Sequence, residues 1–66
     1  MRNALYMFRH SLRLSQQEMA DKIGCHRATY AAIESGSRDG GGGFWNKLKT
    51  AFDIPDDEIG GLMKVD

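Results

Sequence analysis

Cysteine, histidine and arginine follow one another at Cys25, His26 and Arg27, and these residue types are suited to metal binding or catalysis. A zinc site needs three or four ligands. Only Cys25, His26 and His10 are available besides carboxylates, and we expect Cys25 to face the core. No serine accompanies a histidine and an orienting carboxylate, and the glycine run at 40–43 lacks the Gly-Lys-Ser/Thr ending of a phosphate-binding loop. We therefore expect no metal, no cofactor, no small-molecule ligand and no enzymatic activity.

Helices must position these residues, because helical spacing recurs along the chain and polar–apolar alternation is absent. Leu5, Phe8 and Leu12 are spaced to share one face of a first helix. Ser15 followed three residues later by Glu18 is the capping-box arrangement, which predicts the start of a second helix. The chain therefore turns between two helices just before position 15.

Glycines predict where the second and third helices end. Gly24 suits the end of the second helix, because glycine tolerates positive φ. A third helix is predicted over about residues 27–34, with Tyr30 and Ile33 pointing inward, and Gly36 ends it. The second and third helices are thus joined by a short turn, and Ala20 is small enough to let them cross closely.

The remaining third of the chain predicts two more helices. Each glycine in a helix costs about 1 kcal/mol relative to alanine, so the four at 40–43 favour a flexible connector. A fourth helix is predicted over about residues 44–52. Pro55 fits the first position of a fifth helix, which the glycine pair at 60–61 should weaken. The sequence predicts an all-α fold, with residues 1–66 forming one domain.

The run from Ser15 to Gly36 resembles the helix-turn-helix of the lambda-repressor-like (Cro or Xre) family. Its first half matches the pattern Ser-Gln-x-x-(Leu/Met)-Ala-x-x-(Ile/Leu)-Gly at every specified position. Its second half continues with a small apolar residue, a cap, Arg, x, Thr, a large apolar residue, and later Ile-Glu-x-Gly. The resemblance covers about residues 4–60, and it implies a compact five-helix bundle that binds double-stranded DNA.

The resemblance implies that the third helix enters the major groove, amino end first. Arg27 can then donate twice to guanine O6 and N7, hold a phosphate or remain solvated. Ala28 and Ala32 can touch only thymine methyl groups or allow close approach. The resemblance also implies that Arg9 and Glu34 form a partly buried ion pair. The other candidates for DNA contact are Gln16, Gln17, His26, Thr29, Ser35 and Arg38.

Positive and negative charges are unevenly distributed along a chain whose net charge is zero. Residues 1–52 hold eight Lys and Arg against four Asp and Glu, whereas residues 53–66 hold one Lys against five acids. A basic body suits one face that meets phosphate, and it equally suits a pair of solvated faces. The acidic, partly apolar segment of about residues 56–66 could supply a homodimer contact. Without an apolar run of about 18 residues, we expect a cytoplasmic protein.

Two classes of function remain open. The first is a small repressor-like transcriptional regulator of phage or mobile-element type. The second is a protein-interaction module that kept the fold without DNA binding, or the antitoxin of a toxin–antitoxin pair. The neutral net charge, the alanines of the third helix and the glycine run favour the second class.

Overall fold

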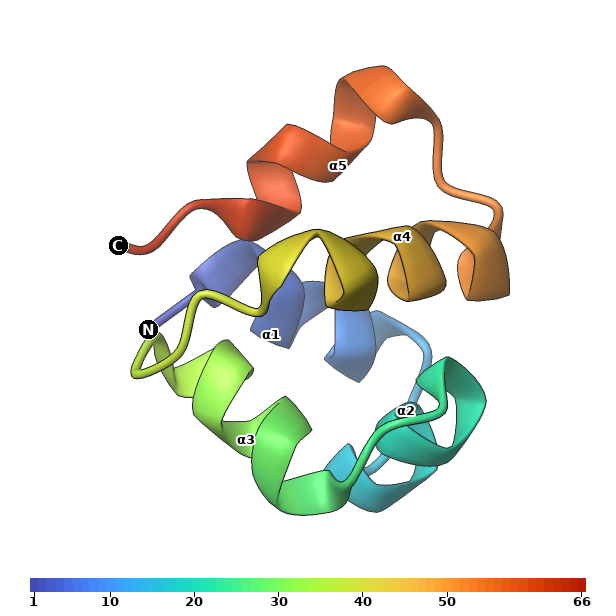
Figure 1. Ribbon diagram of the computed structural model, residues 1–66, viewed down its shortest axis with the longest axis vertical. Helices are drawn as coiled ribbons and strands as arrows, with labels where there is room; N and C mark the ends of the chain where they lie inside the picture. The colour runs from blue at the N-terminus through green and yellow to red at the C-terminus, as the bar shows by residue number, and fades with distance from the viewer.

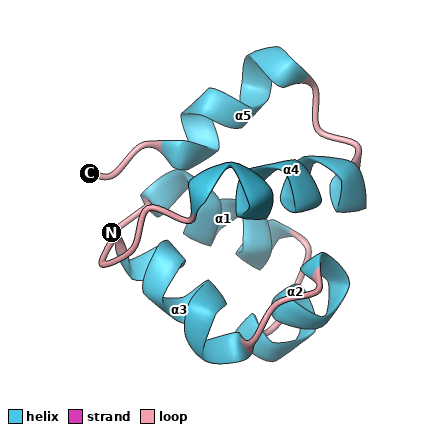
Figure 2. Ribbon diagram, viewed as in Figure 1, coloured by secondary structure: helices cyan, strands magenta, loops and turns pink.

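The computed structural model describes residues 1–66, and all of its regular secondary structure is helical (Figure 2). The prediction of an all-α, five-helix fold is confirmed. The five helices are α1 (Asn3–Ser11), α2 (Gln16–Ile23), α3 (Arg27–Ser35), α4 (Gly41–Phe52) and α5 (Asp56–Met63).

The helices pack so that α2 and α3 form one end of the molecule and α5 the other (Figure 1). α2 packs mainly on α3, α1 packs on α5, and α4 contacts both α2 and α5. The two chain ends lie side by side in Figure 1, and the Asp66 N–H donates to the Met1 carbonyl at 2.9 Å. This arrangement leaves the outer faces of α2 and α3 unpartnered.

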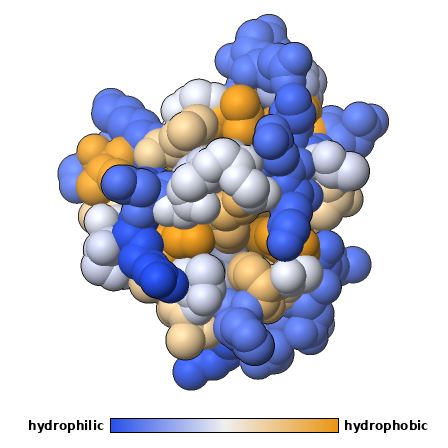
Figure 3. Space-filling view, viewed as in Figure 1, coloured by the Kyte–Doolittle hydropathy of each residue, from blue (hydrophilic) through white to orange (hydrophobic).

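A single hydrophobic core joins the first four helices. α5 contributes only the partly buried Ile59 and Leu62. The face seen in Figure 3 shows hydrophobic side chains in small separate groups among hydrophilic ones. Ala20 is fully buried, which suits its predicted place between α2 and α3. The buried hydrophobic residues are Leu5, Met19, Ala20, Ile23, Tyr30, Ile33, Phe44, Trp45, Leu48 and Ile54.

The connection from α1 to α2 differs in one residue from the prediction. Leu12, expected on the buried face of the first helix, is 41% exposed. α1 ends at Ser11 and Leu12 is its C-cap, so Leu12 lies beyond the last helical residue whose side chain the spacing would place on the core. Arg13 then takes a left-handed φ of 58°. The capping box is present, since the Ser15 hydroxyl accepts from the Glu18 N–H at 3.1 Å and Glu18 accepts from the Ser15 N–H at 2.9 Å.

The glycine run is helical rather than a flexible connector, which corrects the prediction. Gly40 is the N-cap of α4, with φ of 90°, and the next three glycines form the first helical turn. A Cβ on Gly40 would lie 3.0 Å from Trp45 Nε1 and 3.3 Å from Phe44. Burial of Phe44 and Trp45 anchors this turn, so tertiary packing overrides the low helix propensity of glycine.

α5 continues through the glycine pair that was expected to weaken it, and it ends at Met63. Pro55 is predicted as the first helical residue, but it is the N-cap and the helix begins one residue later, at Asp56. Ile59 and Leu62 pack on the core and hold the helix in place. Each of the five helices falls short of the length and apolar character that a membrane span needs.

Candidate nucleic-acid interface

A glycine in the left-handed region creates the turn between α2 and α3. Gly24 has φ of 89° and ψ of 37°, and a Cβ there would meet no atom within 4 Å. The backbone conformation, rather than a lack of space, therefore requires glycine. The N–H groups of Gly24 and Cys25 both donate to the Ala20 carbonyl, at 2.8 and 3.0 Å. These bonds satisfy the end of α2 and set the direction in which α3 begins.

The amino end of α3 is open to solvent. His26 is the N-cap, in extended conformation, and its side chain makes no capping hydrogen bond. Arg27 and Ala28, the first two helical residues, are exposed. The free N–H groups of a helix start carry partial positive charge, so an arginine here reinforces a positive end.

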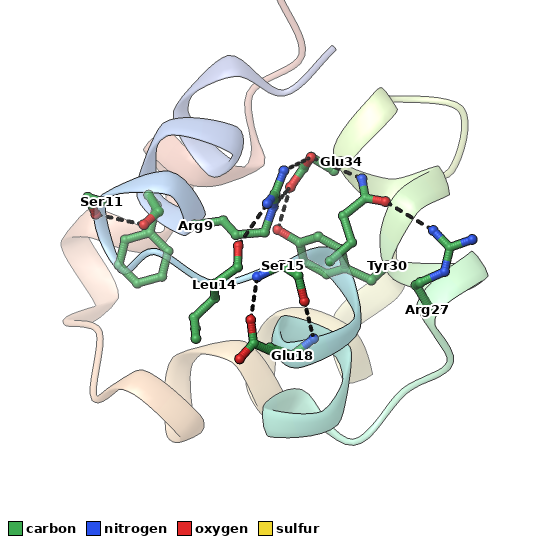
Figure 4. A network of polar contacts seen from close by, with 10 residues as sticks. Arg9, Ser11, Leu14, Ser15, Glu18, Arg27, Tyr30 and Glu34 are labelled. Atoms are coloured by element: carbon green, nitrogen blue, oxygen red, sulfur yellow. Dashed lines mark hydrogen bonds and ion pairs between the residues drawn. The ribbon is translucent and has the colours of Figure 1, made fainter.

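Behind this exposed end lies a buried ion pair. Arg9 donates from Nε to Glu34 Oε2 at 2.8 Å and from Nη2 to Oε1 at 3.1 Å. Arg9 also donates to the Leu14 carbonyl at 2.8 Å, and the Tyr30 hydroxyl donates to Glu34 Oε2 at 2.6 Å (Figure 4). The Glu34 side chain is 2% exposed and that of Arg9 is 10% exposed. One carboxylate thus joins α1 to α3.

The network shifts the acidity of its members. Burial opposes ionisation of Glu34, but hydrogen bonds from Arg9, Tyr30 and Gln16 outweigh it and lower the pKa of the carboxyl. The hydrogen bond to Glu34 raises the pKa of the Arg9 guanidinium, against the effect of burial. Burial and the bond to Glu34 raise the pKa of the Tyr30 hydroxyl. The pair is therefore ionised, and the tyrosine is a neutral donor.

Gln16 connects this buried pair to the exposed arginine. Its Nε2 donates to Glu34 Oε1 at 3.3 Å, so its Oε1 is left to accept from Arg27 Nη1 at 3.4 Å. Since the carboxylate can only accept, Glu34 fixes which end of the amide faces outward. Arg27 lies at the outer end of the network in Figure 4. The start of α2 and the start of α3 thus meet through one amide group.

Two other predicted residues lie on the exposed surface and make local bonds. Gln17 donates from Nε2 to Asp21 Oδ1 at 2.9 Å, one turn along α2. The Ser35 hydroxyl donates to the Ala32 carbonyl at 2.9 Å and lies 3.0 Å from the Ser37 hydroxyl. Both side chains have further hydrogen-bonding capacity that they do not use in these contacts.

Thr29, Ala32 and Arg38 complete the predicted set. Thr29 and Ala32 are half-buried, and Arg38 is exposed on the loop that joins α3 to α4. Thr29 and Arg38 share the wall of a surface hollow of about 520 Å³. The same hollow is lined by Ile33, Ser37, Asp39 and Gly40, so its lining is mostly polar.

Cys25 and His26 have no cluster of potential metal ligands around them. No group of three or more His, Cys, Asp or Glu side chains is placed to hold a metal ion. Cys25 is half-buried and packs against the core. Burial raises the pKa of its thiol, with Lys47 opposing the shift, so the sulfur stays protonated at neutral pH.

Arg2 is the residue that inspection of the sequence missed. It is 4% exposed, although it is the second residue of the chain. Its guanidinium donates to backbone carbonyls, among them those of Arg38 and Asp39. No helical spacing or motif includes this residue, so nothing in the sequence distinguishes it from a solvated arginine.

Comparison with known proteins agrees with this geometry. A family model described as Helix-turn-helix matches residues 5–59. No curated protein and no solved structure matches the chain. The matched residues run from the first core leucine to the inner face of α5. A match of that extent means that the chain belongs to the lambda-repressor-like, Xre-type helix-turn-helix family of sequence-specific DNA-binding regulators.

Proposed function

We propose that this chain reads double-stranded DNA with α3 in the major groove and acts as a small repressor-like regulator of phage or mobile-element type. The observation that carries the proposal is the link from Arg27 through Gln16 to buried Glu34. A base-reading side chain discriminates best when its rotamer is held by supporting hydrogen bonds. Here Gln16 supports the exposed Arg27 side chain, and the buried Glu34 carboxylate in turn holds Gln16.

The side chains of this surface divide by chemistry. The planar fork of Arg27 suits bidentate donation to guanine O6 and N7. Ala28 and Ala32 suit contact with thymine methyl groups or close approach to base edges. Polar and basic side chains around them suit the phosphate backbone, which most protein–DNA hydrogen bonds involve. We assign that role to Gln16, Gln17, His26, Thr29, Ser35 and Arg38.

We further propose that residues 1–66 act as one domain and bind as a homodimer. Helix-turn-helix dimers place two recognition helices on half-sites about 34 Å apart. Met63 and Val65, at 41% and 51% exposure, are large hydrophobic residues near the end of the chain. They support residues 56–66 as the dimer contact. Sedimentation with and without a two-site duplex tests the stoichiometry.

One observation favours a second function. α3 presents alanines at positions 28, 31 and 32, and the charges of the whole chain sum to zero. Such a helix also suits a protein-interaction module, or an antitoxin that binds a protein partner. This alternative predicts no salt-dependent binding to duplex DNA.

Selection of binding sites from random duplex DNA tests the proposal. A reader of base edges should enrich one sequence, and its affinity for that sequence should fall steeply as salt rises, with a slope near 0.9 per phosphate contacted. Arg27→Ala serves as the recognition variant. Lys22→Met is the matched control, since it removes one exposed positive charge outside the assigned contacts. Failure to enrich any sequence, together with flat salt dependence, would favour the interaction module.

A further inference from the structure

Arg2 is a buried cation without an acidic partner. Its Nε donates to the Met63 carbonyl at 2.9 Å, and Nη1 donates to the carbonyls of Ile33 and, at 2.8 Å, Arg38. Nη2 donates to the Asp39 carbonyl at 3.4 Å. Every acceptor is a main-chain oxygen, and none of the ion pairs in the molecule involves Arg2. A guanidinium remains charged in proteins, so this environment must compensate its burial.

Two helix ends and an aromatic ring supply that compensation. Ile33 and Met63 lie in the last turns of α3 and α5, where the main-chain carbonyls carry partial negative charge. The Trp45 ring centroid lies 5.3 Å from Arg2 Cζ, within cation–π range. The site is therefore built for a planar cation with several donors.

Arg2 restrains the loop between α3 and α4. The Arg38 and Asp39 carbonyls are held from the inside by Arg2. The Asp39 carbonyl also accepts from Trp45 Nε1 at 2.9 Å, and Gly40 packs tightly against that same indole. In Figure 1 the N-terminus lies beside this loop, away from the turn between α2 and α3. The loop is thus fixed through its backbone, while the Arg38 side chain is free on the surface.

We propose that Arg2 is a positioning residue for DNA binding. By holding consecutive carbonyls of the loop, it fixes the direction in which the Arg38 side chain leaves the surface and meets a phosphate. Because Arg2 also donates to the Met63 carbonyl, the orientation of the Arg38 side chain depends on the position of the end of α5. Arg2 and Met63 both lie outside the residues 5–59 that match the family, whereas the loop that Arg2 holds lies inside them. The proposal rests on the proposed function, in which Arg38 contacts the DNA backbone.

The decisive substitution is Arg2→Lys, which keeps the charge but replaces the fork by a single point of donors. Lysine cannot reach the four carbonyls together, so the loop loses its internal clamp. A double-mutant cycle combines it with Arg38→Ala, and Lys22→Met controls for a change elsewhere on the surface. Each protein is titrated with a selected duplex at several salt concentrations. The temperature is one at which circular dichroism shows every variant to be folded.

We expect Arg2→Lys to bind about tenfold more weakly, as for loss of one charged hydrogen bond, and to lower the salt slope by about 1. Arg38→Ala should do the same. The double variant should bind no more weakly than Arg38→Ala alone, because both changes remove one contact. The proposal is overturned if Arg2→Lys lowers only the melting temperature, or if the two losses multiply.

Amide exchange tests the clamp without DNA. The N–H groups of Ser37 and Arg38 both donate to the Ala32 carbonyl, at 3.0 and 3.2 Å, and they report on the loop. Arg2→Lys should speed their exchange by about tenfold or more, because local opening becomes easier. The Gly24 amide serves as the internal reference. Unchanged exchange at 37 and 38 would overturn the proposal, whereas absence of duplex binding by the unmodified protein would refute only the proposed function.

A second variant covers the case in which Arg2→Lys does not fold. Trp45→Phe removes the other donor to the Asp39 carbonyl and keeps an aromatic ring in the core. It should speed exchange at Ser37 and Arg38 and lower the salt slope in the same direction. If the slope and the exchange rates both match those of the unmodified protein, the clamp does not position the loop.

Discussion

Of the substitutions considered, we expect removal of the Glu34 carboxylate to destabilise the packing of α3 the most. Four hydrogen bonds converge on it, two from Arg9, one from Tyr30 and one from Gln16. Glu34→Ala leaves the Arg9 guanidinium and the Tyr30 hydroxyl buried without their acceptor. α3 would then lose its ion pair with α1 and keep only apolar contacts and the hydrogen bonds from Arg2 at the start of α1.

The expected loss is large relative to the whole stability. Breaking a buried ion pair by removing one partner costs about 3–5 kcal/mol, and the core of a domain this small supplies about 3–5 kcal/mol in total. Glu34→Ala should therefore be largely unfolded at 37 °C. Glu34→Gln keeps the volume and one acceptor oxygen, so we expect a loss of about 1–3 kcal/mol, the cost of an unsatisfied buried donor.

Urea unfolding followed by circular dichroism measures the coupling. The cycle compares Glu34→Gln, Arg9→Met and the double variant. Arg9→Met removes the hydrogen bond to the Leu14 carbonyl whether or not Glu34 is also changed, so its loss cancels in the coupling energy. We expect a coupling energy of about 1–3 kcal/mol, because the double variant buries no unpaired charge. Losses that add to within about 0.5 kcal/mol would refute the argument that the two side chains stabilise each other.

Three further predictions concern stability. Ala20→Leu should cost about 1–3 kcal/mol by overpacking a fully buried position, and an unchanged melting temperature would mean that the contact can expand. Gly60→Ala and Gly61→Ala should each stabilise α5 by about 0.5–1 kcal/mol, since a Cβ meets nothing there. Gly41→Ala, at φ of 66°, should destabilise instead, and equal effects at all three would contradict the assigned backbone. Because the folded pKa of Glu34 is lowered, its stabilisation is present above about pH 4.5 and is lost as pH falls through the folded pKa. Acid titration of Glu34→Gln should therefore show a weaker pH dependence than the unmodified protein.

Local signals in the sequence predict much of the fold because they act within a few residues. Ser15 and Glu18 satisfy each other's backbone groups, and Gly24 takes the left-handed conformation that ends α2. These effects need no distant partner. The second and third helices, and the turn between them, are therefore predictable from the sequence alone.

Features that depend on distant contacts are not predictable in this way. The first turn of α4 is all glycine, and it is helical because Phe44 and Trp45 are buried beneath it. Leu12 has the spacing of a core residue, but α1 ends at Ser11 and Leu12 is its exposed C-cap. Arg2 is buried only because the ends of α3 and α5 meet beside it.

The candidate site is predictable in its residue types but not in its connections. The motif places a glutamine at the start of α2 and an arginine at the start of α3, yet it does not specify which groups they contact. The structure adds the chain of hydrogen bonds from Glu34 through Gln16 to Arg27. This chain depends on how α2 packs on α3, which no spacing encodes.

Affinities of the unmodified protein and of Arg27→Ala, on the selected duplex and on duplexes changed at single base pairs, test the role of α3 most directly. If Arg27 reads a guanine, the substitution should cost about 1–3 kcal/mol on the selected duplex and should relax selectivity at one base pair, leaving the others unchanged. A loss that is equal on every duplex, with a salt slope smaller by about 1, would contradict base reading and assign Arg27 to a phosphate. Unchanged affinity on all duplexes would contradict the placement of α3 in the major groove.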